Sequence, residues 1–517
     1  MVSPNSLNHT DSKSVCCSVF LPNFEVTVVS TALVDISNNL RAFSRTGWVM
    51  VAYLTTYTGL IIIWAKLSDI IGRKVALTAS LVAFTAFSAG CGAAQTITQL
   101  IVLRAFQGFG GAGCFSVASV IVFEMVPTQK YPFYGSIVSA VVALATLLGP
   151  IIGGLITENC SWRWVFLINV PIGVTTIIIL LITLPNSFPC HSRKTAPMAL
   201  QNSSLPNLRR MDFLGAFLFT GASFTFVTSL LESSTKYSWS SAPTIVLLVI
   251  SVALAISFIS WERYITLGSN MPEPIFPWRF VYNRAWMGML LVSLLLGIPF
   301  CVLVVTIPQK LQTISDMSPL QSGLRLLPYA LFAPFGAVFA NGFISRQKNC
   351  VPVYFVIAGA CFQLIGLSLF CIYGTGKEVS GAQYGCQILA GLGLGMMFGT
   401  LVVMTPLSVD LQDLATATGA IMQFRQFGST IGLSVATSLM NAKLKSELPS
   451  ILKPVQLEAL LQSTTAIHQF PREVKLVVEE VFVEGYRLQM EVIIAFAGAC
   501  VLVALIIFKK KQIKAPG

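Results

Sequence analysis

The sequence is poor in charge and in histidine. Of its 517 residues only 10% are Asp, Glu, Lys or Arg, and the three histidines are His9, His191 and His468. Soluble globular proteins are about 25% charged, so this composition excludes a normal water-exposed surface. The chain also lacks an HExxH motif, a P-loop and a recognisable Ser/His/Asp spacing, which disfavours a zinc protease, direct use of ATP and a serine hydrolase. We therefore expect no enzymatic activity, no cofactor and no bound metal.

Paired cysteines are missing as well. The twelve cysteines stand singly apart from Cys16 and Cys17, and none forms a CxxC pair. This pattern indicates neither a zinc site nor a disulfide framework, and we interpret the cysteines as small membrane-buried side chains. The first fifteen residues are polar and lead into an apolar segment, so no cleavable signal peptide is expected.

Apolar residues, by contrast, are abundant and make up 55% of the chain. The net charge of +12 is compatible with a nucleic-acid binder, but Lys and Arg form short clusters between apolar runs, as they do in membrane proteins. We therefore expect a lipid bilayer, and no nucleic acid, around this protein.

A membrane-spanning helix needs about 20 mostly apolar residues. Fourteen such windows are found, at 16–36, 47–65, 75–95, 100–122, 136–157, 164–184, 212–231, 243–261, 285–306, 322–344, 351–373, 382–404, 415–439 and 489–508. The first contains Pro22, Asn23 and Glu25, so its start is expected to be shortened.

Basic residues in short loops favour the cytoplasmic side of a membrane. With a cytoplasmic amino terminus, the inner loops and tail contain Lys66, Arg73, Lys74, Lys130, Arg193, Lys194, Arg209, Arg210, Arg263, Arg279, Arg284, Arg346, Lys348, Lys509, Lys510, Lys511 and Lys514. The outer loops contain fewer, namely Arg41, Arg45, Arg163, Lys236, Lys310 and Lys377. Both termini are therefore predicted inside. Segment 441–488 would lie outside despite its basic residues, because long loops obey the rule weakly.

The stretch "AKLSDIIGRK", residues 65–74, joins the second and third windows. Asp69 can accept hydrogen bonds from free amides at a helix amino terminus, and Gly72 permits a tight turn. Arg73 and Lys74 are expected to face the cytoplasm. An ordinary positively charged inner loop is the alternative interpretation.

The stretch "RAFQGFGGAG", residues 104–113, lies inside the fourth window. Arg104, Gly108 and Gly111 share one helix face, next to Gln107. An arginine inside a span needs a partner or a water-filled cavity, and the glycines let another backbone approach. A purely structural anchor in the packing face is the alternative.

The stretch "GPIIGG", residues 149–154, contains a GxxxG face formed by Gly149 and Gly153, with Gly154 beside it. Pro150 removes a backbone hydrogen bond, so this helix can bend and pack closely, although a plain contact between two helices is also possible. The next stretch, "SWRWVFLINVPIG", has two tryptophans at a predicted membrane boundary. The sequon at Asn159 falls on the outer side and is a candidate for glycosylation.

With these motifs in this order, the sequence resembles the major facilitator superfamily, and within it the fourteen-helix drug:proton antiporter branch. The motifs look like the signatures of loop 2–3, helix 4, helix 5 and the fourteen-helix branch. Residues 24–36, 318–328 and 424–432 also look like segments of this branch. Ala65 departs from the pattern, since glycine is usual there.

The resemblance implies an all-α membrane protein with the major facilitator fold, in which fourteen helices form two six-helix bundles and an inserted pair. The expected parts are a cytoplasmic tail 1–15, the first bundle 16–184, an inner loop 185–211, the inserted pair 212–261, an inner loop 262–284, the second bundle 285–508 with its outer loop 441–488, and a basic tail 509–517.

The resemblance also implies alternating access with proton coupling. Glu25 would carry the proton, unless it is only a lid residue, and Arg104 with Gln107 would respond to its protonation. Arg425 would anchor the second bundle. Packing between the bundles would depend on Gly149, Pro150, Gly153 and Gly154, and an inner latch would consist of Asp69, Gly72, Arg73 and Lys74.

The function implied is export of a hydrophobic or amphipathic small molecule, such as a fungal secondary metabolite, toxin or drug, in exchange for protons. We expect a monomer in the plasma membrane. Relatives of this branch also suggest two alternatives, vacuolar transport of basic amino acids and siderophore exchange. A non-transporting membrane sensor or enzyme is a third hypothesis, disfavoured by the missing motifs.

Overall fold

The computed structural model consists of long helices joined by short turns. It describes residues 9–125, 131–184, 212–235, 237, 240–268, 274–276, 278–346, 350–376, 379–409, 414–462, 466–467 and 470–508. Several sequence-based assignments lie outside the described residues: positions 1–8 of the amino-terminal tail, the whole inner loop 185–211, the tail 509–517, and Lys130, Lys236, Lys348, Lys377, His191 and His468.

All fourteen expected spans lie on helices. These are α1 (His9–Asn39), α2 (Thr46–Ile71), α3 (Arg73–Ala93), α4 (Ile97–Glu124), α5 (Tyr131–Asn159), α6 (Arg163–Leu167) with α7 (Asn169–Thr183), α9 (Phe213–Thr235), α10 (Ala242–Leu267), α12 (Arg284–Thr313), α13 (Pro319–Leu324) with α14 (Leu327–Arg346), α15 (Val353–Tyr373), α16 (Ala382–Ser408), α17 (Leu414–Ile451) and α19 (Arg472–Ile507). Short helices η1 (Phe43–Arg45), α11 (Arg279–Tyr282) and α18 (Pro454–Gln462) connect them.

Among the described residues, thirteen stretches are long and apolar enough to cross a membrane, and α17 is the remaining helix of the expected set. Helix α17 is less apolar because it is enclosed by protein, in contact with α2, α9, α12, α16 and α19. A helix shielded from lipid can carry polar side chains that a lipid-facing helix cannot.

The first span is not shortened. Helix α1 runs without a break through Pro22, and the Asn23 amide donates to the Val19 carbonyl at 2.8 Å. Tyr53 of α2 donates to the carbonyl of Pro22 at 3.3 Å. A proline is tolerated here because neighbouring side chains satisfy the polar groups around it. The expectation of a shortened start was therefore wrong.

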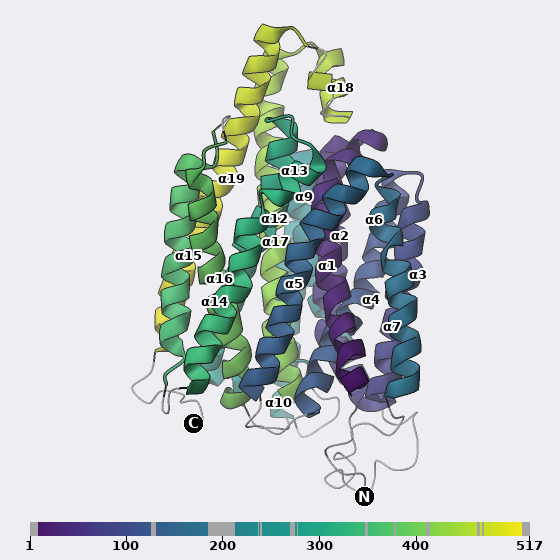
Figure 1. Ribbon diagram of the computed structural model, residues 1–517, viewed down its shortest axis with the longest axis vertical. Coiled ribbons are helices and arrows are strands. Elements are labelled where there is room, and N and C mark those ends of the chain that lie inside the picture. The colour runs from purple at the N-terminus through teal and green to yellow at the C-terminus, as the bar shows by residue number, and fades with distance from the viewer. Residues whose placement is uncertain are drawn as a thin grey trace, which may run out of the picture.

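Figure 1 shows two bundles side by side, with the start of α1 and the end of α19 at the lower end of the molecule. In the first bundle α1 packs on α5, and α4 packs on α2 and α3. In the second bundle α16 packs on α14 and α15, and α12 packs on α17 and α19. The inserted helix α9 contacts α2 of the first bundle and α17 of the second, while α10 packs on α9. The start of α1 and the end of α19 thus share one side, which agrees with the charge distribution.

The described residues of segment 441–488 form a helical cap. The ends of α17 and α19 rise above the bundles as a helical hairpin that carries α18, at the top of Figure 1. The cap has its own small apolar core, which includes Leu444, Leu448, Phe482 and Tyr486. Lys443 bridges two carboxylates, at 2.5 Å from Glu447 and 2.6 Å from Glu484.

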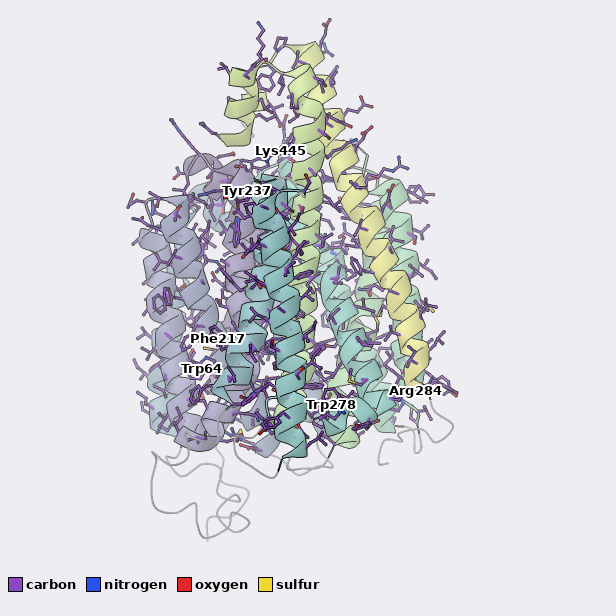
Figure 2. All side chains as sticks on the ribbon, turned by 180° about the vertical axis from the view of Figure 1, so that it is seen from behind. Trp64, Phe217, Tyr237, Trp278, Arg284 and Lys445 are labelled. Atoms are coloured by element: carbon purple, nitrogen blue, oxygen red, sulfur yellow. The ribbon has the colours of Figure 1, made fainter. Side chains whose placement is uncertain are left out.

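Amphipathic side chains mark the two ends of the spans. Figure 2 shows Tyr237 and Lys445 toward the upper end and Trp278 and Arg284 toward the lower end. Such residues are enriched where the bilayer meets water. Between these ends α10 exposes large apolar side chains, among them Val249 at 60% and Ile256 at 59%. This face suits contact with lipid.

Candidate functional site

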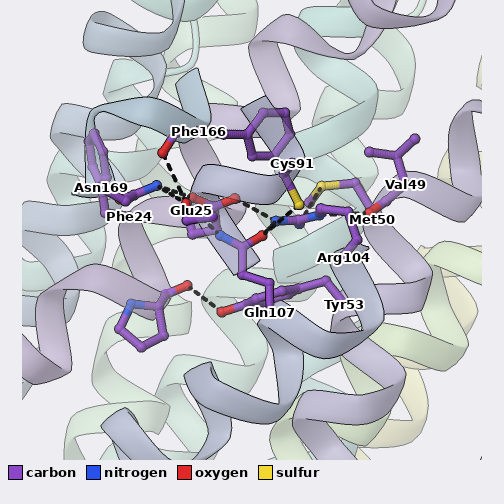
Figure 3. A network of polar contacts seen from close by, with 12 residues as sticks. Phe24, Glu25, Val49, Met50, Tyr53, Cys91, Arg104, Gln107, Phe166 and Asn169 are labelled. Carbon is purple, nitrogen blue, oxygen red and sulfur yellow. Dashed lines mark hydrogen bonds and ion pairs between the residues drawn. The ribbon is translucent and has the colours of Figure 1, made fainter. Parts of the chain in front are cut away.

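A buried ion pair lies at the centre of the first bundle. Glu25 of α1 and Arg104 of α4 are both 0% exposed, and Nη1 of Arg104 lies 2.5 Å from Oε1 of Glu25 (Figure 3). The sequence predicted that Glu25, Arg104 and Gln107 act together. The structure brings all three into one network, because the same Nη1 also donates to Oε1 of Gln107 at 2.8 Å.

Further contacts fix both members of the pair. The Asn169 amide of α7 donates to Oε2 of Glu25 at 2.5 Å, and Nε of Arg104 donates to the Val49 carbonyl at 3.0 Å. The guanidinium also lies 4.4 Å from the centre of the Tyr53 ring. Sequence reasoning gave Asn169 and Tyr53 no role, although an amide inside the apolar window 164–184 was a usable signal.

The glycines beside Arg104 explain how the site is enclosed. A β-carbon at Gly111 would lie 2.6 Å from the Tyr53 hydroxyl oxygen, and one at Gly108 would meet the backbone of Tyr53. Helix α2 can therefore lie directly against this face of α4, as the motif predicted. The close approach removes water from the ion pair.

This arrangement can exist in two charge states. An ionised Glu25 balances Arg104, whereas a protonated Glu25 leaves the arginine charge without a carboxylate partner. A buried charge without a partner is strongly destabilising. Proton gain or loss at Glu25 would therefore change how α1, α4 and α7 pack.

The 65–74 loop forms a second polar cluster, at the lower end of the first bundle. Arg73 donates from Nε to Oε2 of Glu124 at 3.0 Å and from Nη2 to Oε1 at 2.6 Å. It also pairs with Asp69 and donates to the Ser68 hydroxyl. The loop therefore joins the ends of α2 and α4 through the start of α3.

Two expectations for this loop were wrong. Arg73 does not face the cytoplasm but is 4% exposed, because two carboxylates hold it inside the bundle. The amino terminus of α3 has no side-chain cap, since Asp69 binds the Arg73 side chain instead of free amides. Gly72 does form the tight turn, with φ of 94°, and Lys74 donates to the Leu181 carbonyl at 2.8 Å.

We predict that Arg73→Gln lowers the free energy of unfolding by about 2 kcal/mol, because the part-buried Glu124 and the exposed Asp69 lose charged hydrogen bonds to a buried arginine. Lys74→Gln is the matched control and should change it by less than about 0.5 kcal/mol, because its single bond is exposed. Thermal unfolding of the purified variants measures both. Equal effects of the two substitutions would contradict this prediction.

The glycines of α5 face two different neighbours. Gly149 and Gly153 lie against Thr27 and Val28 of α1, within the first bundle. Gly154 instead lies against Leu320 of α13, and a β-carbon at Gly323 would meet the Pro150 backbone. Only Pro150 and Gly154 of this set therefore lie at the contact between bundles. Asn159, the last residue of α5, is exposed.

Arg425 lies apart from these clusters, on α17 in the second bundle. It is 4% exposed, and its guanidinium lies 4.7 Å from the centre of the Phe398 ring. It lines a cavity that also contacts Val142 and Thr146 of α5. A larger apolar cavity, of about 590 Å³, lies between the inserted pair and α17, lined by Phe219, Phe258 and Phe427 among others.

Sequence comparison places this architecture in a known family. Residues 15–268 match the Major Facilitator Superfamily. The MFS-type transporter FPY5 of Fusarium mangiferae is 36% identical over 508 residues, covering 98% of this chain and 85% of that protein. The chain belongs to the major facilitator superfamily. It is therefore a multi-pass membrane transporter and not an enzyme, as the sequence predicted.

Two further relatives carry names that state export. The MFS-type efflux pump LUC4 of Fusarium sp is 28% identical, covering 94% of this chain and 84% of that protein. The efflux pump FUS6 of Gibberella moniliformis is 27% identical, covering 93% and 84%. This chain is thus similar over nearly its whole length to fungal efflux-type transporters of the superfamily.

Solved structures agree on the fold. A bacterial homologue of the human lysosomal transporter Spinster, in an inward-facing and occupied conformation, matches with a TM-score of 0.58 at 13% identity, covering 96% of each chain. The proton:xylose symporter XylE matches with a TM-score of 0.56 at 12% identity, covering 99% of this chain and 98% of that one. At such low sequence identity these matches support a shared fold and nothing further.

Proposed function

We propose that this transporter exports a hydrophobic or amphipathic small molecule, such as a fungal secondary metabolite, toxin or drug, in exchange for protons. The observation that carries the proposal is the buried Glu25–Arg104 pair, in which both side chains are 0% exposed. Burying an ionisable pair inside a membrane bundle costs free energy, so the presence of such a pair indicates a functional site. The names of the fungal relatives, efflux pumps among them, support export as the direction.

In this proposal Glu25 is the proton carrier. Protonation removes its charge, weakens the bond to Arg104 and frees the Asn169 amide that holds its other oxygen. Because these residues lie on α1, α4 and α7, the packing of three helices changes with one proton. Arg104 and Gln107 respond to the proton rather than carry it.

Movement of the two bundles would use the contacts at their outer ends. There Gly154 of α5 lies against α13, Gly323 lies against Pro150, and Gln312 of α12 donates to the Thr31 carbonyl of α1 at 3.0 Å. These contacts join the bundles on the side predicted to be outside. Opening toward that side has to separate them.

We place the protein in the plasma membrane, where export of a toxic compound is useful to the cell. Vacuolar uptake of basic amino acids is less favoured, because among the described residues Arg425 is the only one with an ionised side chain that lines the cavity shared with α5. A cationic substrate would be repelled there. Siderophore exchange stays a prediction. A vacuolar location of a fluorescently tagged chain would favour one of these two alternatives, and a plasma-membrane location would favour export.

Expression in a yeast host stripped of its own exporters tests this function. We expect lower accumulation of at least one member of a radiolabelled panel of neutral, anionic and cationic hydrophobic compounds, by about tenfold. A protonophore should abolish the difference, because no gradient then remains to drive exchange. An accumulation difference that survives the protonophore would rule out proton coupling, and no difference for any compound would rule out export of these classes.

A further inference from the structure

The second bundle contains a buried arginine without a carboxylate partner. Helices α12 to α16 have no acidic residue, and α17 has none before Glu447. Arg425 forms no ion pair with any described residue. In the first bundle, by contrast, the charge of the buried Arg104 is balanced by the carboxylate of Glu25.

The guanidinium of Arg425 also has free donors. Its Nε and Nη2 are buried and have no hydrogen-bond partner among the described residues. The contacts it does have are with the faces of two aromatic rings, those of Phe398 at 4.7 Å and Phe300 at 5.6 Å. Ring faces attract a cation but accept no strong hydrogen bond, so the planar donor edge stays available.

A second unpaired donor lies in the same cavity wall. The Tyr329 side chain of α14 is 0% exposed, and its hydroxyl has no partner among the described residues. Both Arg425 and Tyr329 line one cavity, whose other lining residues are apolar except for Thr146 and include Leu296, Phe300 and Phe398. Two unsatisfied donors against an otherwise apolar wall match an acceptor group attached to an apolar body.

The cavity lies between the two bundles. Val142 and Thr146 of α5 form one wall, and α12, α14, α16 and α17 form the others. Two neighbours of Arg425 on α17 also contact Thr58 of α2. The Gln423 amide donates to the Thr58 carbonyl at 2.9 Å, and the Thr430 and Thr58 hydroxyls lie 3.4 Å apart. The cavity measures about 40 Å³, room for a few water-sized groups. It would widen whenever α5 moves away from the second bundle.

We propose that Arg425 and Tyr329 bind the acidic group of the transported molecule, so that the substrate is a hydrophobic organic anion such as a carboxylic acid. Arg425 supplies a planar pair of N–H donors, which suits a carboxylate, and the Tyr329 hydroxyl donates to it as well. Phe300, Phe398 and the apolar wall contact the body of the molecule. This inference rests on the proposed export function and names its substrate class.

Binding of three probes with one aromatic body tests the inference without any proton gradient. The probes are 2-naphthoate, 2-naphthylmethanol and 2-naphthylmethylamine, titrated by calorimetry into the purified chain in an uncharged detergent. We expect the carboxylate to bind at least tenfold more tightly than the other two. Equal binding, preference for the amine, or no binding of the carboxylate would overturn the inference.

Substitutions assign the preference to the site. Arg425→Gln should bring the three affinities within about threefold, and Tyr329→Phe should reduce the carboxylate preference in part. If the Arg425→Gln variant does not fold, Arg425→Lys replaces it, because lysine keeps the charge but lacks the planar pair of N–H donors. Arg325→Gln is the matched control, because Arg325 donates to the Tyr384 hydroxyl at 2.9 Å outside this cavity. A preference that survives in both Arg425 variants and in Tyr329→Phe would overturn the inference.

Two further measurements separate the possible origins of a result. If replacing gluconate by chloride at equal ionic strength abolishes carboxylate binding, the site holds an inorganic anion and the substrate assignment is wrong. Transport in proteoliposomes then separates the two proposals. Carboxylate binding without gradient-driven export would contradict the proposed function alone, and export of neutral compounds with no carboxylate preference would contradict this inference alone.

Discussion

Glu25→Gln is expected to reduce proton-driven export to the background rate while substrate binding changes by no more than about threefold. Glutamine has nearly the volume of glutamic acid and its amide oxygen can still accept from Arg104, but it carries no titratable proton. The variant therefore resembles the protonated state permanently. Substrate export by proteoliposomes with an imposed pH gradient measures the loss, and calorimetric binding measures what remains.

The controls for this result use the ion pair itself. Arg104→Gln alone should lower the free energy of unfolding by about 3–5 kcal/mol, because it leaves a buried carboxylate without a charged partner. The double variant with Glu25→Gln should recover most of that loss, since no isolated charge remains, yet it should not export. Glu473→Gln, at an exposed carboxylate in the first turn of α19, should export normally. Export against a gradient by Glu25→Gln would show that the proton is carried elsewhere.

Gly154→Leu is expected to hold the two bundles apart at their outer ends and to lower export by at least about tenfold. Any β-carbon at this position would lie 2.9 Å from the Leu320 nitrogen and 3.0 Å from the Pro319 carbonyl oxygen, too close for the present packing. Because that contact joins two bundles that move relative to each other, separation relieves the clash without unfolding either bundle. The protein would then stay open toward the outside.

Chemical cross-linking between the bundles measures that change. The Ser318 hydroxyl donates to Oε2 of Glu158 at 3.4 Å across the same contact, so cysteines placed at 158 and 318, with Cys160→Ser, should be joined by a short bifunctional maleimide. Adding Gly154→Leu should reduce cross-linking severalfold. Undiminished cross-linking would contradict the prediction.

Two glycine substitutions serve as controls for Gly154→Leu. Gly498 of α19 has open space around its position, so the Gly498→Leu variant should export normally. Gly149→Leu faces α1 inside one bundle and should lower the free energy of unfolding instead, because those helices stay packed throughout transport. Similar behaviour of Gly149→Leu and Gly154→Leu would show that the two positions do not differ as the packing indicates.

Much of the fold could be predicted from the sequence because membrane insertion is a local property. Length and apolarity located fourteen helices, and basic residues placed both termini on one side. The same reasoning failed at the start of α1, where Pro22, Asn23 and Glu25 predicted a shortened span. It also failed at Arg73, which a loop count assigned to the cytoplasm. In both places a contact with another helix, to Tyr53 or to Glu124, outweighed the local rule.

The sequence by itself therefore determined the number, order and polarity of the helices and the presence of ionisable residues inside them. Only the tertiary structure decided how those residues are partnered: Arg104 meets a carboxylate 79 positions away, whereas Arg425 meets two aromatic rings and an open cavity. Helices that are apolar on all sides carry no periodic signal of which face turns inward. Partner choice is then set by close packing between segments far apart in the chain, where glycines such as Gly154 fix which backbones touch.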